Sequence, residues 1–226
     1  MSNYLPKDYQ TFIHKSRYAR WLDDLGRRET WPETVTRYVD NVVRPALEKA
    51  NIATAKIKKL TQEVEQSIIG LESMSSMRAL MTAGPAFTRD NTAGYNCSYL
   101  PVDDIKAFDE AMFILLCGTG VGFSVERQFI SKLPDVPQLF ESDTCVVIRD
   151  SKEGWAKGLR QVLALLWAGE IPKWDVSKVR PAGARLKTFG GRASGPSPLI
   201  DLFNFVVHTF KESQGRKLSS LECHDV

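Results

Sequence analysis

Residues 95–126, YNCSYLPVDDIKAFDEAMFILLCGTGVGFSVE, contain the pattern that decides the fold. The segment 95–100 predicts a strand, and Asp103 is placed to cap a helix that ends at Gly118. The segment 122–126 then predicts a second strand. A strand, a helix and another strand in this order are typical of a parallel βαβ unit.

A second strand and helix follow this unit. Residues 145–149 predict a strand, and Asp150 and Glu153 fit a capping box that opens a helix running to Gly169. A last helix is expected over about 197–214. The alternation of strands and helices predicts an α/β fold built around a mainly parallel sheet.

The N-terminal part predicts helices only. Residues 8–25 place apolar side chains at helical spacing, and 56–70 predict an amphipathic helix. Thr30 and Glu33 fit a capping box at the start of a further helix. Pro45 is expected to break or kink that helix, because proline lacks the amide hydrogen that the interior of a helix requires.

Composition excludes several classes of protein. The chain has 226 residues, of which 43% are hydrophobic and 25% charged, as in ordinary globular proteins. A net charge of +3 is too small to indicate a nucleic-acid partner. No apolar run could cross a bilayer, and the N-terminus lacks the apolar core of a signal peptide, so we expect a cytoplasmic protein with no membrane partner. The four cysteines form no CxxC motif or zinc-spaced cluster, so no metal site is predicted.

Three segments could carry chemistry, and each has a structural alternative. The glycines of 118–122 let backbone approach a ligand, or they form a tight helix-to-strand turn. The segment 178–198 holds five cations and no acid, which suits phosphate binding but also a solvated loop. Cys97 lies on a predicted strand, where a single cysteine is usually a small core residue.

Taken together, the motifs resemble those of the adenosylcobalamin-dependent (class II) ribonucleoside-triphosphate reductases. The resemblance covers nearly the whole chain and keeps one order from end to end. The similar segments are RYARW (17–21), RRETWPETVTRYVD (27–40), MRALMTAG (77–84), AGYNCSYLPVDD (93–104), CGTGVGFSVER (117–127), DSKEGWAKGL (150–159), WDVSKVRPAGARLKTFGGRASGP (174–196) and GRKLSSLECHD (215–225).

The resemblance implies a fold and a reaction. Residues 1–72 correspond to a helical N-terminal region, and 73–226 to the first part of a ten-stranded α/β barrel that includes an effector and specificity loop. The family replaces the ribose 2′-hydroxyl of a ribonucleoside triphosphate with hydrogen. A cysteine thiyl radical, generated with adenosylcobalamin, starts this reaction, and a thioredoxin-like reductant resets the enzyme.

The resemblance also assigns roles to individual residues. Cys97 matches the first redox-active cysteine, since removing the 2′-oxygen as water consumes two electrons that a pair of thiols can supply. The residues expected beside the substrate are Ser75, Ser76, Asn96, Thr119, Gly120 and Gly122. Those expected at the deoxynucleoside triphosphate (dNTP) effector and specificity loop are Asp103, Asp150, Ser151, Lys152, Arg185, Lys187 and Arg192.

One family motif is missing. The radical-bearing cysteine of the family lies in an Asn-x-Cys-x-Glu pattern, whereas the cysteines here read YNCSY, LLCGT, DTCVV and LECHD. We therefore expect an N-terminal portion that is inactive alone and needs a complementary C-terminal chain, which would also bind most of the cobalamin. The alternative is a non-catalytic nucleotide-binding or regulatory module derived from a reductase.

Overall fold

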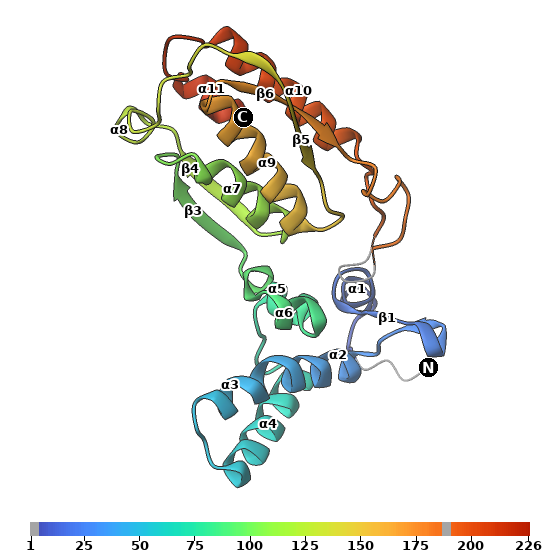
Figure 1. Ribbon diagram of the computed structural model, residues 1–226. Coiled ribbons are helices and arrows are strands. Elements are labelled where there is room, and N and C mark those ends of the chain that lie inside the picture. The colour runs from blue at the N-terminus through green and yellow to red at the C-terminus, as the bar shows by residue number, and fades with distance from the viewer. Residues whose placement is uncertain (1–4, 187–190) are drawn as a thin grey trace. The chain divides into compact units, whose positions relative to one another are not determined.

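The computed structural model describes residues 5–186 and 191–226 (Figure 1). The chain forms two compact units, Met1–Asn96 and Cys97–Val226. This boundary lies later than the one predicted at residue 72. The reason is that the short helices α5 (Met77–Thr82) and α6 (Pro85–Arg89) contact N-terminal helical segments.

The N-terminal unit is mainly helical, as predicted. A small core of Leu5, Trp31, Val35, Val39, Ile68 and Leu80 holds it together. Besides α5 and α6, its elements are α1 (Asp8–Ile13), the π-helix η1 (His14–Tyr18), β1 (Trp21–Leu22), the 3₁₀ helix η2 (Asp23–Leu25), β2 (Arg27–Arg28), α2 (Trp31–Tyr38), the π-helix η3 (Val39–Val43), α3 (Arg44–Lys49), α4 (Thr54–Ile69) and the 3₁₀ helix η4 (Asn91–Gly94).

Two features of this unit differ from the prediction. The first helical stretch ends at Tyr18, because Ala19 is extended and the chain then enters the antiparallel pair β1–β2. Pro45 does not break its helix. The π turn η3 precedes it and α3 continues through it, which is how a wider turn accommodates a missing amide hydrogen. The capping box of Thr30 and Glu33 is confirmed.

A buried polar network crosses the N-terminal unit. His14 is only 3% exposed, and its Nε2 lies 2.9 Å from Thr34 Oγ1. Thr34 donates in turn to the Glu29 carboxylate. Glu29 also forms an ion pair with Arg37, whose Nε lies 2.8 Å from Glu29 Oε1. Arg37 also donates to the backbone oxygens of Leu80 and Ala83. Arg37 therefore ties α2 to the end of α5.

The C-terminal unit contains two parallel βαβ units, which confirms the mixed α/β class. In the first, β3 (Cys97–Pro101) and β4 (Gly120–Ser124) flank α7 (Lys106–Leu116). In the second, β5 (Phe140–Val147) and β6 (Glu170–Asp175) flank α9 (Lys152–Trp167). The remaining helices of the unit are α8 (Arg127–Ile130), α10 (Ser197–Glu212) and α11 (Ser220–Asp225).

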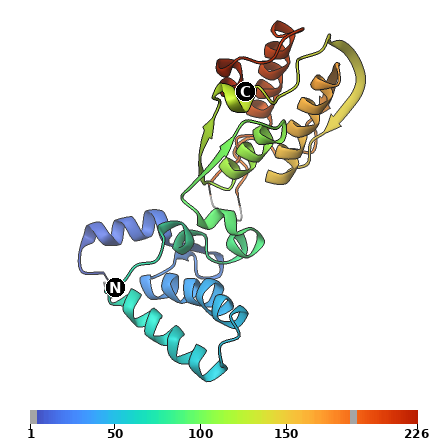
Figure 2. The same cartoon turned by 90° about the vertical axis from the view of Figure 1, so that its left-hand side faces the viewer.

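The strands of the C-terminal unit form two separate parallel pairs, whereas the sequence predicts one sheet. Helices α7 and α9 contact each other between the pairs, and Figures 1 and 2 both show them side by side. The apolar side of α9 is completely buried at Val162, Leu163 and Leu166. Packing between helices therefore joins the two βαβ units.

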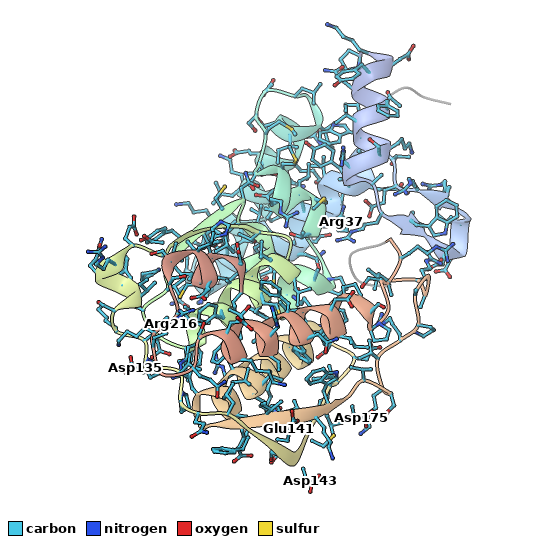
Figure 3. All side chains as sticks on the ribbon, turned by 90° about the horizontal axis from the view of Figure 1, so that it is seen from above. Arg37, Asp135, Glu141, Asp143, Asp175 and Arg216 are labelled. Carbon is cyan, nitrogen blue, oxygen red and sulfur yellow. The ribbon has the colours of Figure 1, made fainter. Side chains whose placement is uncertain are left out.

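Several acidic side chains lie on the strands β5 and β6. Figure 3 labels Glu141 and Asp143 on β5 and Asp175 at the end of β6. Asp143 pairs with Lys173 at 2.7 Å, and Glu141 with Lys211 of α10 at 3.4 Å. Both ion pairs are exposed, and Asp143 lies within the irregular part of the β5–β6 pairing, between Glu141 and Cys145.

Candidate active site around Cys97

Cys97 begins β3 and has an exposed side chain. Its register partner on β4 is Gly120, and the next outward residue, Tyr99, has Gly122 as partner. In-register residues of parallel strands project to the same side, so the face that carries the thiol and the Tyr99 ring has no side chains on its neighbouring strand. The predicted glycine segment therefore lies beside the predicted redox cysteine.

The opposite face of this pair is packed. Leu100 is 9% exposed and belongs to the core of the unit. Thr119, just before β4, is 1% exposed. Gly118 has φ of 82°, a left-handed conformation that favours glycine, and it turns the chain from α7 into β4. The alternative interpretation of 118–122 as a tight turn thus holds for Gly118, whereas Gly120 and Gly122 lie within the strand.

The four cysteines differ in their surroundings. Cys97 and Cys145 are exposed, and Cys117 and Cys223 are buried. Burial raises the pKa of the Cys223 thiol to about 11, so this sulfur is protonated at neutral pH. Cys117 is completely buried, and its Sγ lies 3.0 Å from Lys152 Nζ.

The basic segment after β6 folds back on itself. Gly183 N donates to Ala193 O, and Ala193 N donates to Ala184 O, at 2.9 and 2.8 Å. Arg185 and Arg192 occupy opposite positions of an antiparallel bridge, and both are exposed. Gly195 has φ of 78° and packs closely on Ala182. A Cβ added at Gly195 would lie 2.9 Å from the amide nitrogen of Ala182. Lys187 lies outside the described residues.

Four residues predicted on the effector side, Asp103, Asp150, Ser151 and Lys152, each have a partner in the protein. Asp103 pairs with Lys132 at 2.8 Å and does not cap α7, because the neighbouring Asp104 accepts from the amide of Lys106. Ser151, and not Asp150, caps α9 by accepting from Gly154 N at 2.9 Å.

The carboxylate of Asp150 is engaged elsewhere. Arg180 Nε lies 3.0 and 2.8 Å from its two oxygens. Asp150 therefore holds an arginine near the start of the basic segment. Lys152, the first residue of α9, directs its amine to Cys117.

The predicted substrate residues Ser75, Ser76 and Asn96 belong to the N-terminal unit, whereas Cys97 begins the C-terminal unit. Ser76 caps α5 by accepting from Ala79 N at 3.5 Å. Ser75 Oγ is buried and has no hydrogen-bond partner among the described residues. Asn96 is exposed. The placement of the two serines relative to Cys97 stays a prediction.

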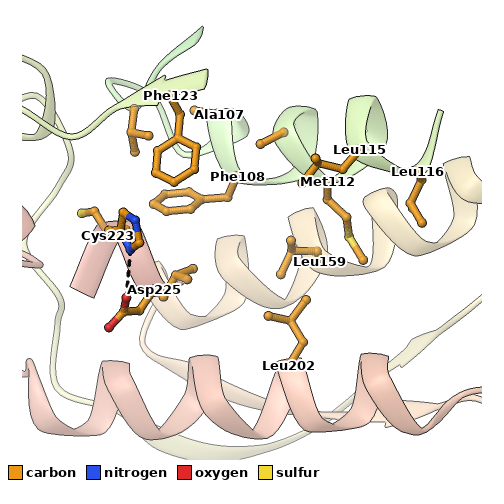
Figure 4. A pocket seen from close by; sticks show the side chains of 14 residues that line it. Ala107, Phe108, Met112, Leu115, Leu116, Phe123, Leu159, Leu202, Cys223 and Asp225 are labelled. Atoms are coloured by element: carbon orange, nitrogen blue, oxygen red, sulfur yellow. Dashed lines mark hydrogen bonds and ion pairs between the residues drawn. The ribbon is translucent and has the colours of Figure 1, made fainter. Parts of the chain in front are cut away.

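The cavities among the described residues of the C-terminal unit include the following two. The first, of about 390 Å³, is mostly apolar and is lined by Phe108, Met112 and Phe123 together with residues of α11 (Figure 4). His224 lies there, with Nδ1 3.0 Å from Asp225 Oδ1. The second cavity, of about 520 Å³, lies along α7 and α9, where Arg160 pairs with the buried Asp109 at 2.8 Å. Neither cavity includes Cys97.

In the described part of the chain, no group of three or more His, Cys, Asp or Glu side chains is arranged to hold a metal ion. Helices long and apolar enough to span a bilayer are likewise absent from residues 5–186 and 191–226.

Sequence reasoning did not foresee the position of Tyr99 or the contact of Arg180, which it counted only among the cations of the basic segment. Tyr99 shares the outward face of β3 with Cys97, and the two-residue period of a strand is the signal that could have identified it. Arg180 anchors the basic segment through Asp150, and no local signal identifies a contact across 30 residues of sequence.

Comparisons with known proteins agree with these motifs. The model of the ribonucleotide reductase alpha domain matches residues 2–85, and the model of the B12-dependent ribonucleotide reductase insertion domain matches residues 127–210. The adenosylcobalamin-dependent ribonucleoside-triphosphate reductase of Lactobacillus gasseri is 27% identical over 281 residues, covering 94% of this chain and 37% of the relative. The reductase of Lactobacillus leichmannii, which has the same name, is 28% identical over 275 residues with the same coverage.

A solved structure agrees as well. The crystal structure of a B12-dependent (class II) ribonucleotide reductase matches with a TM-score of 0.81 and 26% identity, over 95% of this chain and 38% of that protein. The chain thus spans 37% of the length of the curated relatives it matches. In its motifs, their order and its fold, the chain is similar to the B12-dependent (class II) ribonucleotide reductases.

Proposed function

We propose that this chain supplies the first redox cysteine and the nucleotide-contacting segments of a reductase that converts ribonucleoside triphosphates to deoxyribonucleoside triphosphates. The observation that carries the proposal is the exposed thiol of Cys97, in register with Gly120 on a face without neighbouring side chains. A buried thiol packed among apolar residues could not reach a sugar.

The role of Cys97 follows from electron balance. Replacing a C–O bond at the ribose 2′ position by a C–H bond, with release of water, requires two electrons and two protons. Two thiols supply them when their S–H bonds break and one S–S bond forms. We assign Cys97 as one of these thiols. We propose that the second thiol belongs to the complementary portion of the enzyme. A thioredoxin-like dithiol would then reduce the disulfide by exchange.

The strand face supports a binding position for the sugar. Glycine at positions 120 and 122 allows a substrate to lie against backbone beside Cys97, and the exposed ring of Tyr99 borders the same face. Ser75 supports the predicted phosphate contact, because its buried hydroxyl lacks a partner in the described residues and could donate to a phosphate oxygen.

The basic segment supports the effector role. Arg185 and Arg192 face each other across an antiparallel bridge, and like charges in such positions repel. A triphosphate bound between them would relieve this repulsion through charge-assisted hydrogen bonds. The pairing of Arg180 with Asp150 couples the same segment to the start of α9.

We place adenosylcobalamin, on which the relatives depend by name, outside the described residues. Each of the two cavities, of about 390 and 520 Å³, is too small to enclose a corrin ring with its nucleotide and adenosyl groups. These two cavities do not fit this cofactor, and the cysteine of an Asn-x-Cys-x-Glu pattern is absent from the sequence. Activity therefore requires a complementary portion of the enzyme.

Complementation tests the proposal. The chain is mixed with the remaining portion of a class II reductase, adenosylcobalamin, a dithiol and a ribonucleoside triphosphate, and deoxynucleotide is quantified. The wild-type chain is expected to restore turnover, and Cys97→Ser to abolish it. The matched control is Cys145→Ser, which removes the other exposed thiol and should retain activity. Normal turnover by Cys97→Ser contradicts the proposed role.

A nucleotide-binding module without catalysis is the second candidate, favoured by the Arg185–Arg192 bridge and the missing cysteine pattern. Saturable binding of a dNTP by the isolated chain, together with no turnover in any complementation, would support this candidate over the reductase.

A further inference from the structure

Lys152 places its amine against the sulfur of Cys117 inside the C-terminal unit. Nζ lies 3.0 Å from Sγ and 5.3 Å from the centre of the Phe113 ring. A thiol sulfur is a weak hydrogen-bond acceptor, so a lysine gains less here than from a carboxylate. The contact holds a nitrogen and a sulfur atom at a separation that a single oxygen atom can bridge.

We propose that oxidation joins the two side chains through one oxygen atom, giving a Cys117 Sγ–O–Nζ Lys152 bridge. One molecule of hydrogen peroxide converts the thiol to a sulfenic acid and leaves one water. After the lysine ammonium gives one proton to water, a second molecule takes one hydrogen from the sulfenic O–H and one from the amine as the O–N bond forms, leaving two waters. The thiol and the amine together lose four electrons, which the two peroxide molecules accept.

The surroundings favour the bridge at this cysteine over the exposed ones. Cys117 is completely buried beside the half-buried Lys152 side chain, so a sulfenic acid formed there lies closer to an amine than to bulk solvent. Within the described residues, neither Cys97 nor Cys145 has a lysine nitrogen in hydrogen-bond contact. Their exposed thiols are therefore expected to proceed to sulfinic and sulfonic acids.

The bridge would connect two segments of the candidate site. Cys117 directly precedes Gly118 and the glycine strand β4, and Lys152 follows the cap of α9, next to Asp150 and its partner Arg180. An oxidised chain would thus have the glycine segment fixed to the anchor of the basic segment. This inference depends on the geometry of the Lys152–Cys117 pair alone and does not require the proposed function.

Mass spectrometry tests the inference on the full chain. The protein is treated with hydrogen peroxide and digested without reductant, and peptides that contain Cys117 are analysed. The expected product is a cross-linked pair of peptides that is heavier by one oxygen atom and lighter by two hydrogen atoms. Treatment with dithiothreitol should separate the two peptides again.

Variants identify the nitrogen. Lys152→Arg should abolish the cross-link, whereas Lys157→Arg, an exposed lysine on the same helix, should retain it. The wild-type measurement decides the matter even if a variant fails to fold. The inference is overturned if Cys117 remains a thiol or becomes a sulfinic or sulfonic acid while Cys97 and Cys145 are oxidised. A cross-linked peptide without the oxygen atom also overturns it.

Discussion

Arg180 and Asp150 form an ion pair in which the guanidinium Nε lies within 3.0 Å of both carboxylate oxygens, although 30 residues of sequence separate them. The pair connects an arginine near the start of the basic segment to the residue before the cap of α9. Because both side chains are about one-third exposed, the pair contributes little to global stability, about 1 kcal/mol or less. Its main effect is expected on the order of the basic segment.

Asp150→Asn should therefore loosen this segment. We expect faster tryptic cleavage after Arg185 and Arg192, with little change in the denaturation midpoint of the whole chain. Asp143→Asn is the matched control. It removes an exposed ion pair between β5 and β6, with Lys173, that does not involve the basic segment. Equal cleavage rates in the wild-type chain and Asp150→Asn would show that the pair does not anchor the segment.

A side chain at position 120 should obstruct the thiol of Cys97. In a Cys145→Ser background, Cys97 is the exposed cysteine, and its reaction with a disulfide reagent can be followed by absorbance. Gly120→Val should slow this reaction several-fold, because the new side chain projects next to the sulfur. Gly122→Val places the same group opposite Tyr99 and should have a smaller effect. Equal rates in all three proteins would mean that the register does not govern access.

Arg192→Gln should weaken dNTP binding. The substitution removes one of the two facing charges that we assign to phosphate recognition, so titration calorimetry should report a lower affinity and a weaker dependence on salt. Arg149→Gln is the control, since this exposed arginine lies outside the basic segment. A loss of affinity that is equal in both variants would indicate a nonspecific charge effect.

His14 should make the stability of the N-terminal unit depend on pH. Burial, followed by repulsion from Lys15, lowers the pKa of His14 from 6.5 to about 4. Thr34 donates its hydroxyl hydrogen to Glu29, so the neutral imidazole must donate from Nε2 to Thr34. Between pH 6.5 and about 4 the unfolded chain binds a proton that the folded chain does not, and the free energy of unfolding decreases as the pH falls.

Urea denaturation at pH 7 and pH 4.5 measures this effect, which we expect to be on the order of 2 kcal/mol. His14→Asn should remove that part of the pH dependence, and the exposed His208→Asn should leave it in place. An unchanged pH dependence in His14→Asn would contradict the assignment.

Local sequence patterns predicted the helices and strands better than they predicted the contacts between them. The capping box of Thr30 and Glu33 forms as its spacing indicates, since both partners lie within one turn. The cap of α9 was assigned to Asp150 and not Ser151 because both residue types cap helices, and only the distant Arg180 decides between them. Strand β6 was missed because Pro172 lies within it, and proline argues against a strand when the pairing is unknown.

In the candidate site, too, the elements could be predicted from the sequence and the contacts between them could not. The alternation of β3 and the glycines of β4 were visible in the sequence, but their register, which pairs Cys97 with Gly120, is a property of the assembled sheet. The contact between Lys152 and Cys117 joins two helices and has no sequence pattern of its own.

The redox state of Cys97 after one turnover tests the central claim most directly. The chain is combined with its complementary portion, cofactor and ribonucleotide in the absence of external dithiol, and its cysteines are then mapped by mass spectrometry. We predict one Cys97 disulfide for each deoxynucleotide formed, while Cys145 remains a thiol. Deoxynucleotide formed while Cys97 stays reduced would contradict the account.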